Sequence, residues 1–139
     1  MKNILALIIT LFAFSFSYGQ ASDVAHQTVM AQGIEQVKLD LGTKSVEIKQ
    51  TKGSRIIIES RVTLSIPNQT LLNYLIDAGR YGLETSVDPA TATMTIKRKR
   101  NNNLLIVKGQ ECEEQFHYTI FLPESVKFSE DISTSASNN

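Results

Sequence analysis

The sequence predicts a mainly β domain, with antiparallel or solenoid-like sheets and one short amphipathic helix. The stretch 37–66 carries apolar residues at every second position with few interruptions. Because successive side chains of a strand point to opposite faces of a sheet, this period predicts half-buried strands. At residues 69–78 the apolar period becomes that of a helix. Polar segments with glycine, proline or asparagine separate these runs, as is typical of turns.

The first half of the chain is expected to contain several consecutive strands. Gly42-Thr43-Lys44 and Thr51-Lys52-Gly53-Ser54 mark turns within the alternating stretch. Pro67 ends that stretch, because proline has no amide hydrogen for a ladder. The preceding segment 20–33 is polar. We expect a leader there that adds at most one edge strand, near residues 26–31.

The helix is predicted at about 69–78, between recognisable caps. Asn68 or Thr70 suits the N-cap, where a side-chain oxygen accepts a hydrogen bond from a free amide. Gly79 stands where a C-cap glycine belongs. We expect this helix to lie across a sheet face or to plug one end of the sheets.

The second half predicts further strands at 83–87, from 94 to about 100, at 104–107, at 116–122 and from 126 onward. Asp88-Pro89 predicts a turn between the first two. Asn101-Asn102-Asn103 predicts a hairpin that joins the second strand to the third, because asparagine tolerates positive φ.

The N-terminus has the pattern of a signal peptide at residues 1–19. Lys2 precedes an apolar run at 4–16, and Ser17 and Gly19 supply the small residues that a signal peptidase recognises. The run is shorter than the roughly 20 residues that span a bilayer. We therefore expect cleavage before Gln20 and export to the periplasm, the outer surface or the medium, with no transmembrane anchor after cleavage.

Composition then limits the function of the remaining chain. We divide it into a polar leader at 20–33, a β-rich domain at 34–128 and a polar, disordered tail at 129–139. The formal charge of the whole chain is zero, which argues against a nucleic-acid partner. Cys112 is the only cysteine, so no internal disulfide can form and the fold must depend on its apolar core. We expect Cys112 to be an inert or partly buried thiol on which the fold does not depend, so that replacement by serine would hardly change stability.

Catalytic motifs are missing from the sequence. It has no Gly-x-Ser-x-Gly elbow, no His-Glu-x-x-His, no Cys-x-x-Cys and no glycine loop for phosphate. We expect a non-enzymatic protein without a cofactor.

Cys112, Glu113 and His117 form the one cluster with metal-ligand chemistry, since thiolate, carboxylate and imidazole all bind transition metals. Strand alternation, however, points His117 away from the face of its apolar neighbours Phe116 and Tyr118. The favoured interpretation is a solvated acidic loop followed by an exposed histidine.

Four consecutive cations, Lys97, Arg98, Lys99 and Arg100, are the candidate interaction site. They could bind a polyanion, or they could keep an exposed edge strand from pairing with another chain. Alternation sends Lys97 and Lys99 to one face and the two arginines to the other. Edge protection is the favoured interpretation.

Two stretches, IEQVKLDLGTKSVEIKQTKGSRIIIESRV and HYTIFLPESVKF, resemble the adhesin-like head domains of bacterial envelope proteins, many from Bacteroidota. The likeness covers about 35–128 and implies a right-handed β-solenoid. In that family, short glycine-containing coils follow the Leu-Pro step, whereas here the chain turns polar. The resemblance therefore implies either a minimal member of the family or a shortened gene product.

Together these patterns predict an exported envelope or surface module that binds or supports structure. Its partner would be an envelope protein or a surface glycan. The alternative is a small accessory or regulatory envelope protein that binds another protein by strand addition. We also expect weak self-association through an open β edge.

Overall fold

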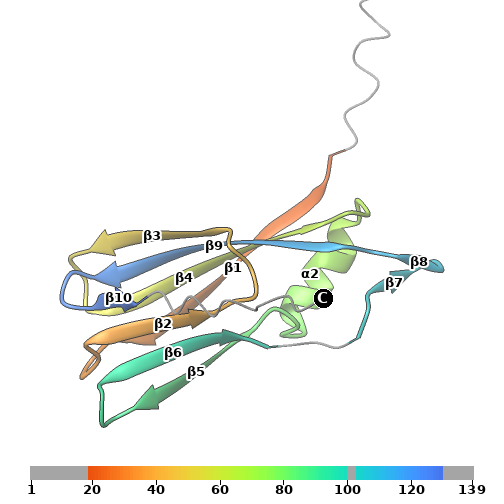
Figure 1. The fold of residues 1–139 in the computed structure, drawn as a ribbon. Coiled ribbons are helices and arrows are strands. Elements are labelled where there is room, and N and C mark those ends of the chain that lie inside the picture. Colours follow the sequence, from red (N-terminus) through yellow and green to blue (C-terminus); the bar gives the residue numbers. More distant parts are fainter. Residues whose placement is uncertain (1–18, 100–102, 130–139) are drawn as a thin grey trace, which may run out of the picture.

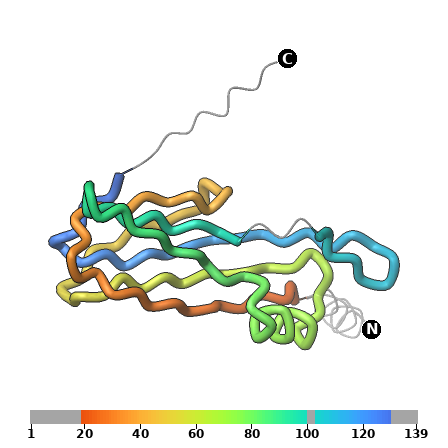
Figure 2. Tube along the Cα trace, turned by 90° about the horizontal axis from the view of Figure 1, so that it is seen from below, coloured from red at the N-terminus to blue at the C-terminus, as the bar shows by residue number. Residues whose placement is uncertain are grey.

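The computed structural model describes residues 19–99 and 103–129. Two four-stranded sheets form two layers, and a helix and a small hairpin lie together at one end of them (Figure 1). Figure 2 shows the same arrangement from below. The predicted class, mainly β with one short helix, is confirmed.

Sheet A has the strand order β1-β4-β9-β3. Its strands are β1 (Ala21–Met30), β4 (Arg55–Leu64), β9 (Glu114–Pro123) and β3 (Val46–Thr51). β4 pairs antiparallel with both β1 and β9, whereas β3 pairs parallel with β9. β1 confirms the expected edge strand of the leader, and it is longer than the sequence suggested.

Sheet B has the strand order β10-β2-β6-β5. Its strands are β10 (Lys127–Ser129), β2 (Gln36–Asp40), β6 (Thr93–Arg98) and β5 (Leu83–Asp88). β2 pairs parallel with β10 and β6, and β5 forms an antiparallel hairpin with β6. In that hairpin the Asp88 carboxylate accepts a hydrogen bond from the Ala90 amide at 3.0 Å, as expected for the Asp88-Pro89 turn.

The main core lies between the two sheets. Inward-facing aliphatic residues of sheet A, such as Ile56, Ile58 and Ile120, pack against Val37 and Ile96 of sheet B, and all five are fully buried. Burial of this apolar surface is the principal stabilising contribution, at roughly 25 cal/mol per Å². The alternation seen in the sequence therefore marks the core face of each strand.

Helix α2 (Gln69–Asp77) covers a second, smaller apolar cluster. The Asn68 side chain accepts a hydrogen bond from the Leu71 amide at 2.9 Å, which confirms Asn68 as the N-cap. Gly79, with φ of 75°, ends the helix in the left-handed region. Leu72 and Leu75 face the ends of β1 and β4, so the helix covers one end of the sheets, as expected.

The prediction of a hairpin between the strands near 94–100 and 104–107 is wrong. β6 lies between β2 and β5, and β7 (Ile106–Val107) pairs with β8 (Gln110–Glu111) instead. Lys108 and Gly109 both have positive φ, the geometry of a tight two-residue hairpin turn. The physical reason is burial, since Met94 and Ile96 of β6 are buried in the main core beside Val37 of β2.

Some expectations lie outside the described residues. They are the signal peptide apart from Gly19, the asparagine turn at 101–102, Arg100 and the polar tail beyond Ser129. Ser129 itself belongs to β10. The described residues contain no helix with the length and apolarity that a membrane crossing requires.

Candidate functional site

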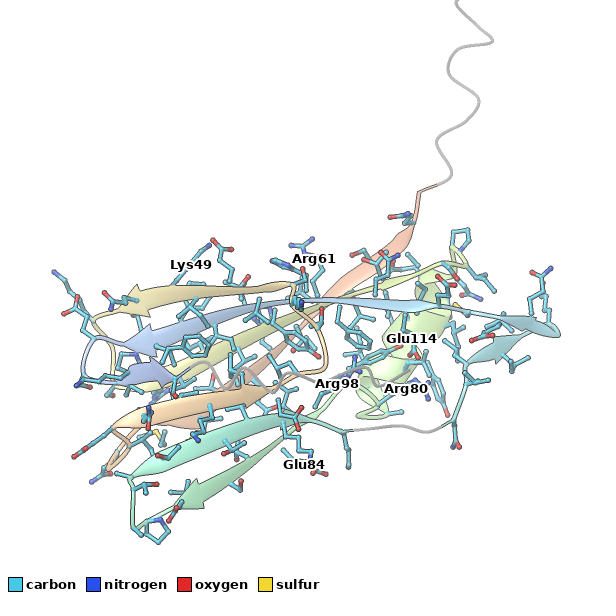
Figure 3. The ribbon with its side chains drawn as sticks, in the orientation of Figure 1. Lys49, Arg61, Arg80, Glu84, Arg98 and Glu114 are labelled. Carbon is cyan, nitrogen blue, oxygen red and sulfur yellow. The ribbon has the colours of Figure 1, made fainter. Side chains whose placement is uncertain are left out.

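A polar network joins the end of α2 to the start of β9. The Arg80 guanidinium binds the Glu114 carboxylate in a bidentate manner, with Nε to Oε1 at 2.8 Å and Nη2 to Oε2 at 2.9 Å. The Tyr81 hydroxyl donates to the same Oε1 at 2.7 Å. Gly79 turns the chain directly after the helix, and this turn places Arg80 and Tyr81 toward β9. Figure 3 shows Arg80 and Glu114 side by side, with Arg98 next to them.

Burial makes this network electrostatically strong. The side chains of Arg80 and Glu114 are only 16% and 17% exposed. Burial alone would raise the pKa of Glu114, but hydrogen bonds from Arg80 and Tyr81 outweigh burial, so the pKa is lowered. Burial, followed by the hydrogen bond to the Glu114 carboxylate, raises the pKa of Tyr81 well above its usual range. The carboxylate is therefore ionised and the phenol neutral at neutral pH.

Arg98 extends the network from β6 toward the aromatic side chains of β9. Its guanidinium carbon lies 4.4 Å from the centre of the Phe116 ring, close enough for a cation–π contact. A Cβ on Gly42 would approach Arg98 Nη2 to 3.1 Å, so glycine leaves room for this side chain. The Phe116 ring stacks on Tyr118 and meets Tyr81 edge to face. Arg98 thus bridges the two sheets at this end of the molecule.

A cavity of about 740 Å³ opens beside the network. Gly42, Thr43 and Arg98 line one part of it, and residues 111–116 line another. Two of the charged groups that border it have partners, since Glu114 is bound by Arg80 and Tyr81 and Arg98 lies on Phe116. Glu111 and Glu113 also border it, and both are exposed. This arrangement orders the start of β9. Ser45 also lines the cavity, and its Oγ lies 2.7 Å from Nδ1 of His117.

Cys112, Glu113 and His117 do not form a metal site. Cys112 is 3% exposed and belongs to the apolar cluster under α2, whereas Glu113 is exposed. His117 lies on the outer face of sheet A, where its Nδ1 is 2.7 Å from Ser45 Oγ. The described residues contain no group of three or more ligating side chains that could hold a metal ion. The predicted orientation of His117 is confirmed, whereas Cys112 is buried more deeply than the partly buried thiol expected from the sequence.

Lys97, Arg98 and Lys99 do not form one cationic patch. Lys97 lies 3.7 Å from Asp40 and is exposed, Lys99 is exposed, and Arg98 turns inward to Phe116. The expected alternation of faces is confirmed for these three residues. Edge protection by this strand is wrong, because β6 has a neighbour on both sides.

Sequence reasoning missed Arg80, Tyr81 and Glu114. Glu114 is 34 residues from Arg80, and no local spacing links them. The available signals were separate ones: the glutamates at 111, 113 and 114, and an arginine directly after the helix-ending Gly79. Only the topology identifies which glutamate meets which arginine.

A second feature is the open side of the two sheets. On one side the Gln27 side chain of β1 binds both backbone groups of Leu83 in β5, each at 3.3 Å. This side-chain bridge joins those two edges. β3 and β10 form the opposite edges, and neither has a further neighbour among the described strands. Phe128 of β10 pairs in register with the buried Val37, yet it is 39% exposed.

The chain has one similar solved structure among the proteins compared with it. No family model matches the chain, and no curated protein matches it. Among solved structures, the crystal structure of a "putative cell adhesion protein" from Clostridium sporogenes ATCC 15579 is similar at a TM-score of 0.39 and 12% identity. The similarity covers 78% of this chain and 45% of that one. The chain therefore spans less than half of the length of that protein.

Replacing Cys112 with serine is expected to lower the free energy of unfolding by about 1–2 kcal/mol, because it places a hydroxyl among apolar side chains. The neighbouring Ser65 Oγ and Glu113 carbonyl oxygen lie 3.8 and 3.9 Å from Sγ, too far for a strong hydrogen bond. Urea unfolding of C112S and C112A measures the effect. Wild-type stability in C112S would contradict the burial of this thiol.

Stability is also expected to depend on Glu114 at acid pH. A carboxylate whose pKa is lower in the folded state stabilises the fold fully above its unfolded-state pKa, about 4.3. This contribution is lost as the pH falls through the lower folded-state pKa. Wild-type and E114Q proteins should therefore differ in urea midpoint at pH about 7 and converge as the pH falls below about 4. A constant difference down to acid pH would contradict the lowered pKa.

Proposed function

We propose that this protein is an exported, non-enzymatic binding module of the cell envelope, adhesin-like in its mode of action. One observation carries the proposal: the buried ionisable groups are used to hold the fold together, while one side of both sheets stays open. Edges and faces of strands are then the surface available for a partner. Membership of the adhesin-like family is part of this proposal.

Export is supported by the N-terminal sequence alone. The apolar run at 4–16 and the small residues Ser17 and Gly19 are the features that a signal peptidase requires. N-terminal sequencing of protein from the expressing cell should find Gln20 as the first residue. A mature chain that retains residues 1–19 would contradict export with cleavage.

Binding is tested with the mature chain, which begins at Gln20, immobilised and exposed to envelope polysaccharide and to envelope protein extract. The adhesin-like function predicts retention of a surface glycan or of a defined envelope protein. F128D and Y74D are matched variants, since Phe128 is 39% and Tyr74 68% exposed but they lie on different parts of the molecule. Capture that F128D abolishes and Y74D preserves supports the open side as the binding surface.

The open side also supports a second candidate function, that of an accessory protein that accepts a strand from another protein. The partly exposed Phe128 at the edge of sheet B is the observation that favours it. In the same experiment, capture of a single envelope protein without any glycan would favour this second function. No retention of either material would contradict both.

A further inference from the structure

We propose that β3 is a self-recognition edge, which pairs antiparallel with β3 of a second copy about a two-fold axis at Ile48. The inference does not depend on what the module binds. It rests on three features of β3: which backbone groups are free, which side chains lie on each face, and where the charges stand.

The first feature is the set of free backbone groups. The Ser45 carbonyl oxygen accepts a hydrogen bond from the Tyr118 amide at 2.9 Å, so it faces β9. Because the direction of peptide groups alternates along a strand, Glu47 and Lys49 also face β9. Ile48 and Gln50 therefore direct their amide and carbonyl groups to the open edge. The carbonyl of Val46 faces the same way, while its amide is bound by the Lys44 carbonyl at 3.0 Å.

The second feature is the separation of the two faces. Val46 and Ile48 are half-buried and pack against the main core, whereas Glu47 and Lys49 lie on the outer face with exposed side chains. A pairing that continues sheet A must keep apolar residues on the core face. An antiparallel partner therefore has to place even-numbered residues opposite even-numbered residues.

The third feature is the pattern of charge, and it selects one register. With Ile48 opposite Ile48 of the second copy, Glu47 stands opposite the second copy's Lys49, and Lys49 opposite its Glu47. Both charge pairs are non-hydrogen-bonded pairs, whose side chains lie closest, with Cα atoms about 4.5 Å apart. Within one copy these two side chains are already 3.6 Å apart, so both point to the same surface.

The neighbouring registers are disfavoured by the same charges. A shift of the partner by two residues in one direction places Glu47 opposite Glu47 of the second copy. A shift by two residues in the other direction places Lys49 opposite Lys49 of the second copy. Like charges directly opposite are destabilising. The pairing at Ile48 is the register of these three that matches opposite charges, and it joins two copies of sheet A into one continuous sheet.

The test is a charge exchange on the mature chain that begins at Gln20, measured by sedimentation velocity over a concentration series. The wild type should form a weak dimer, with a dissociation constant in roughly the micromolar to millimolar range. Each of K49E and E47K creates two like-charge pairs, and each should weaken the dimer about tenfold or more. The double variant E47K/K49E restores opposite charges across the axis and should recover the wild-type dissociation constant.

Two further variants separate this pairing from other contacts. Q50P removes an amide that faces the open edge and makes no ladder bond within one copy, so it should weaken the dimer without unfolding the domain. E84K changes an exposed charge on β5, at the opposite side of the molecule, and should leave the dimer unchanged. Circular dichroism confirms that each variant is folded.

A wild type that is monomeric at every concentration would overturn the proposal and would favour a role of the exposed Lys49 in protecting this edge against pairing. A dimer that all three charge variants leave unchanged would also overturn it. The wild type could also form a charge-sensitive dimer and yet capture neither glycan nor envelope protein. That result would contradict the proposed function and leave this inference standing.

Discussion

Replacing Glu114 with alanine should lower the free energy of unfolding by about 2–4 kcal/mol. The variant leaves the Arg80 guanidinium and the Tyr81 hydroxyl, both largely buried, without the carboxylate that satisfies them. Breaking a buried pair by removing one partner typically costs about 3–5 kcal/mol, and the residual exposure of this pair reduces that figure. Urea unfolding at neutral pH measures the loss.

The control is a solvent-exposed ion pair. Lys97 and Asp40 lie 3.7 Å apart, but their side chains are 51% and 45% exposed, so K97A should cost less than about 1 kcal/mol. A double variant, R80M/E114M, should recover part of the loss, because it leaves no unpaired buried charge. Equal effects of E114A and K97A would show that the network contributes nothing beyond a surface ion pair.

Replacing Leu72 with alanine should lower the free energy of unfolding by a similar amount, about 2–4 kcal/mol. Leu72 belongs to α2 and is fully buried where the helix packs on the apolar residues at the ends of β1 and β4. Truncation removes buried methyl groups and leaves a cavity that its neighbours fill only in part. The loss should appear as a lower urea midpoint by far-ultraviolet circular dichroism.

Tyr74 provides the matched control on the same helix. It is 68% exposed, so Y74A should change stability by no more than about 0.5 kcal/mol. If L72A were as mild as Y74A, the helix would contribute little to the fold and the second apolar cluster would not be a core.

The local elements could be predicted from the sequence because their signals lie within a few residues. Alternation located the strands, since only one face of each sheet is buried. Asn68 and Gly79 marked the ends of the helix, because caps satisfy or terminate a helix through local hydrogen bonds and backbone angles. The outward direction of His117 followed from the same alternation.

Strand pairing could not be predicted in the same way. The turn signal at 101–103 suggested a hairpin, but β6 instead pairs with β2, which lies more than fifty residues away. Alternation shows that a strand has a core face without showing which strand lies beside it. The choice depends on how all the apolar faces are buried together, a property of the whole chain.

The candidate site was the hardest part to predict from the sequence, for the same reason. The sequence by itself determined the secondary structure class, the single helix, the single cysteine and the charge pattern of β3. Only the tertiary structure decided that Cys112 is buried, that Arg98 turns inward, and that Arg80 meets Glu114. The tertiary structure also decided that β3 lies at the edge of sheet A. Local signals act over one turn of backbone, whereas burial and edge position arise only when distant segments pack together.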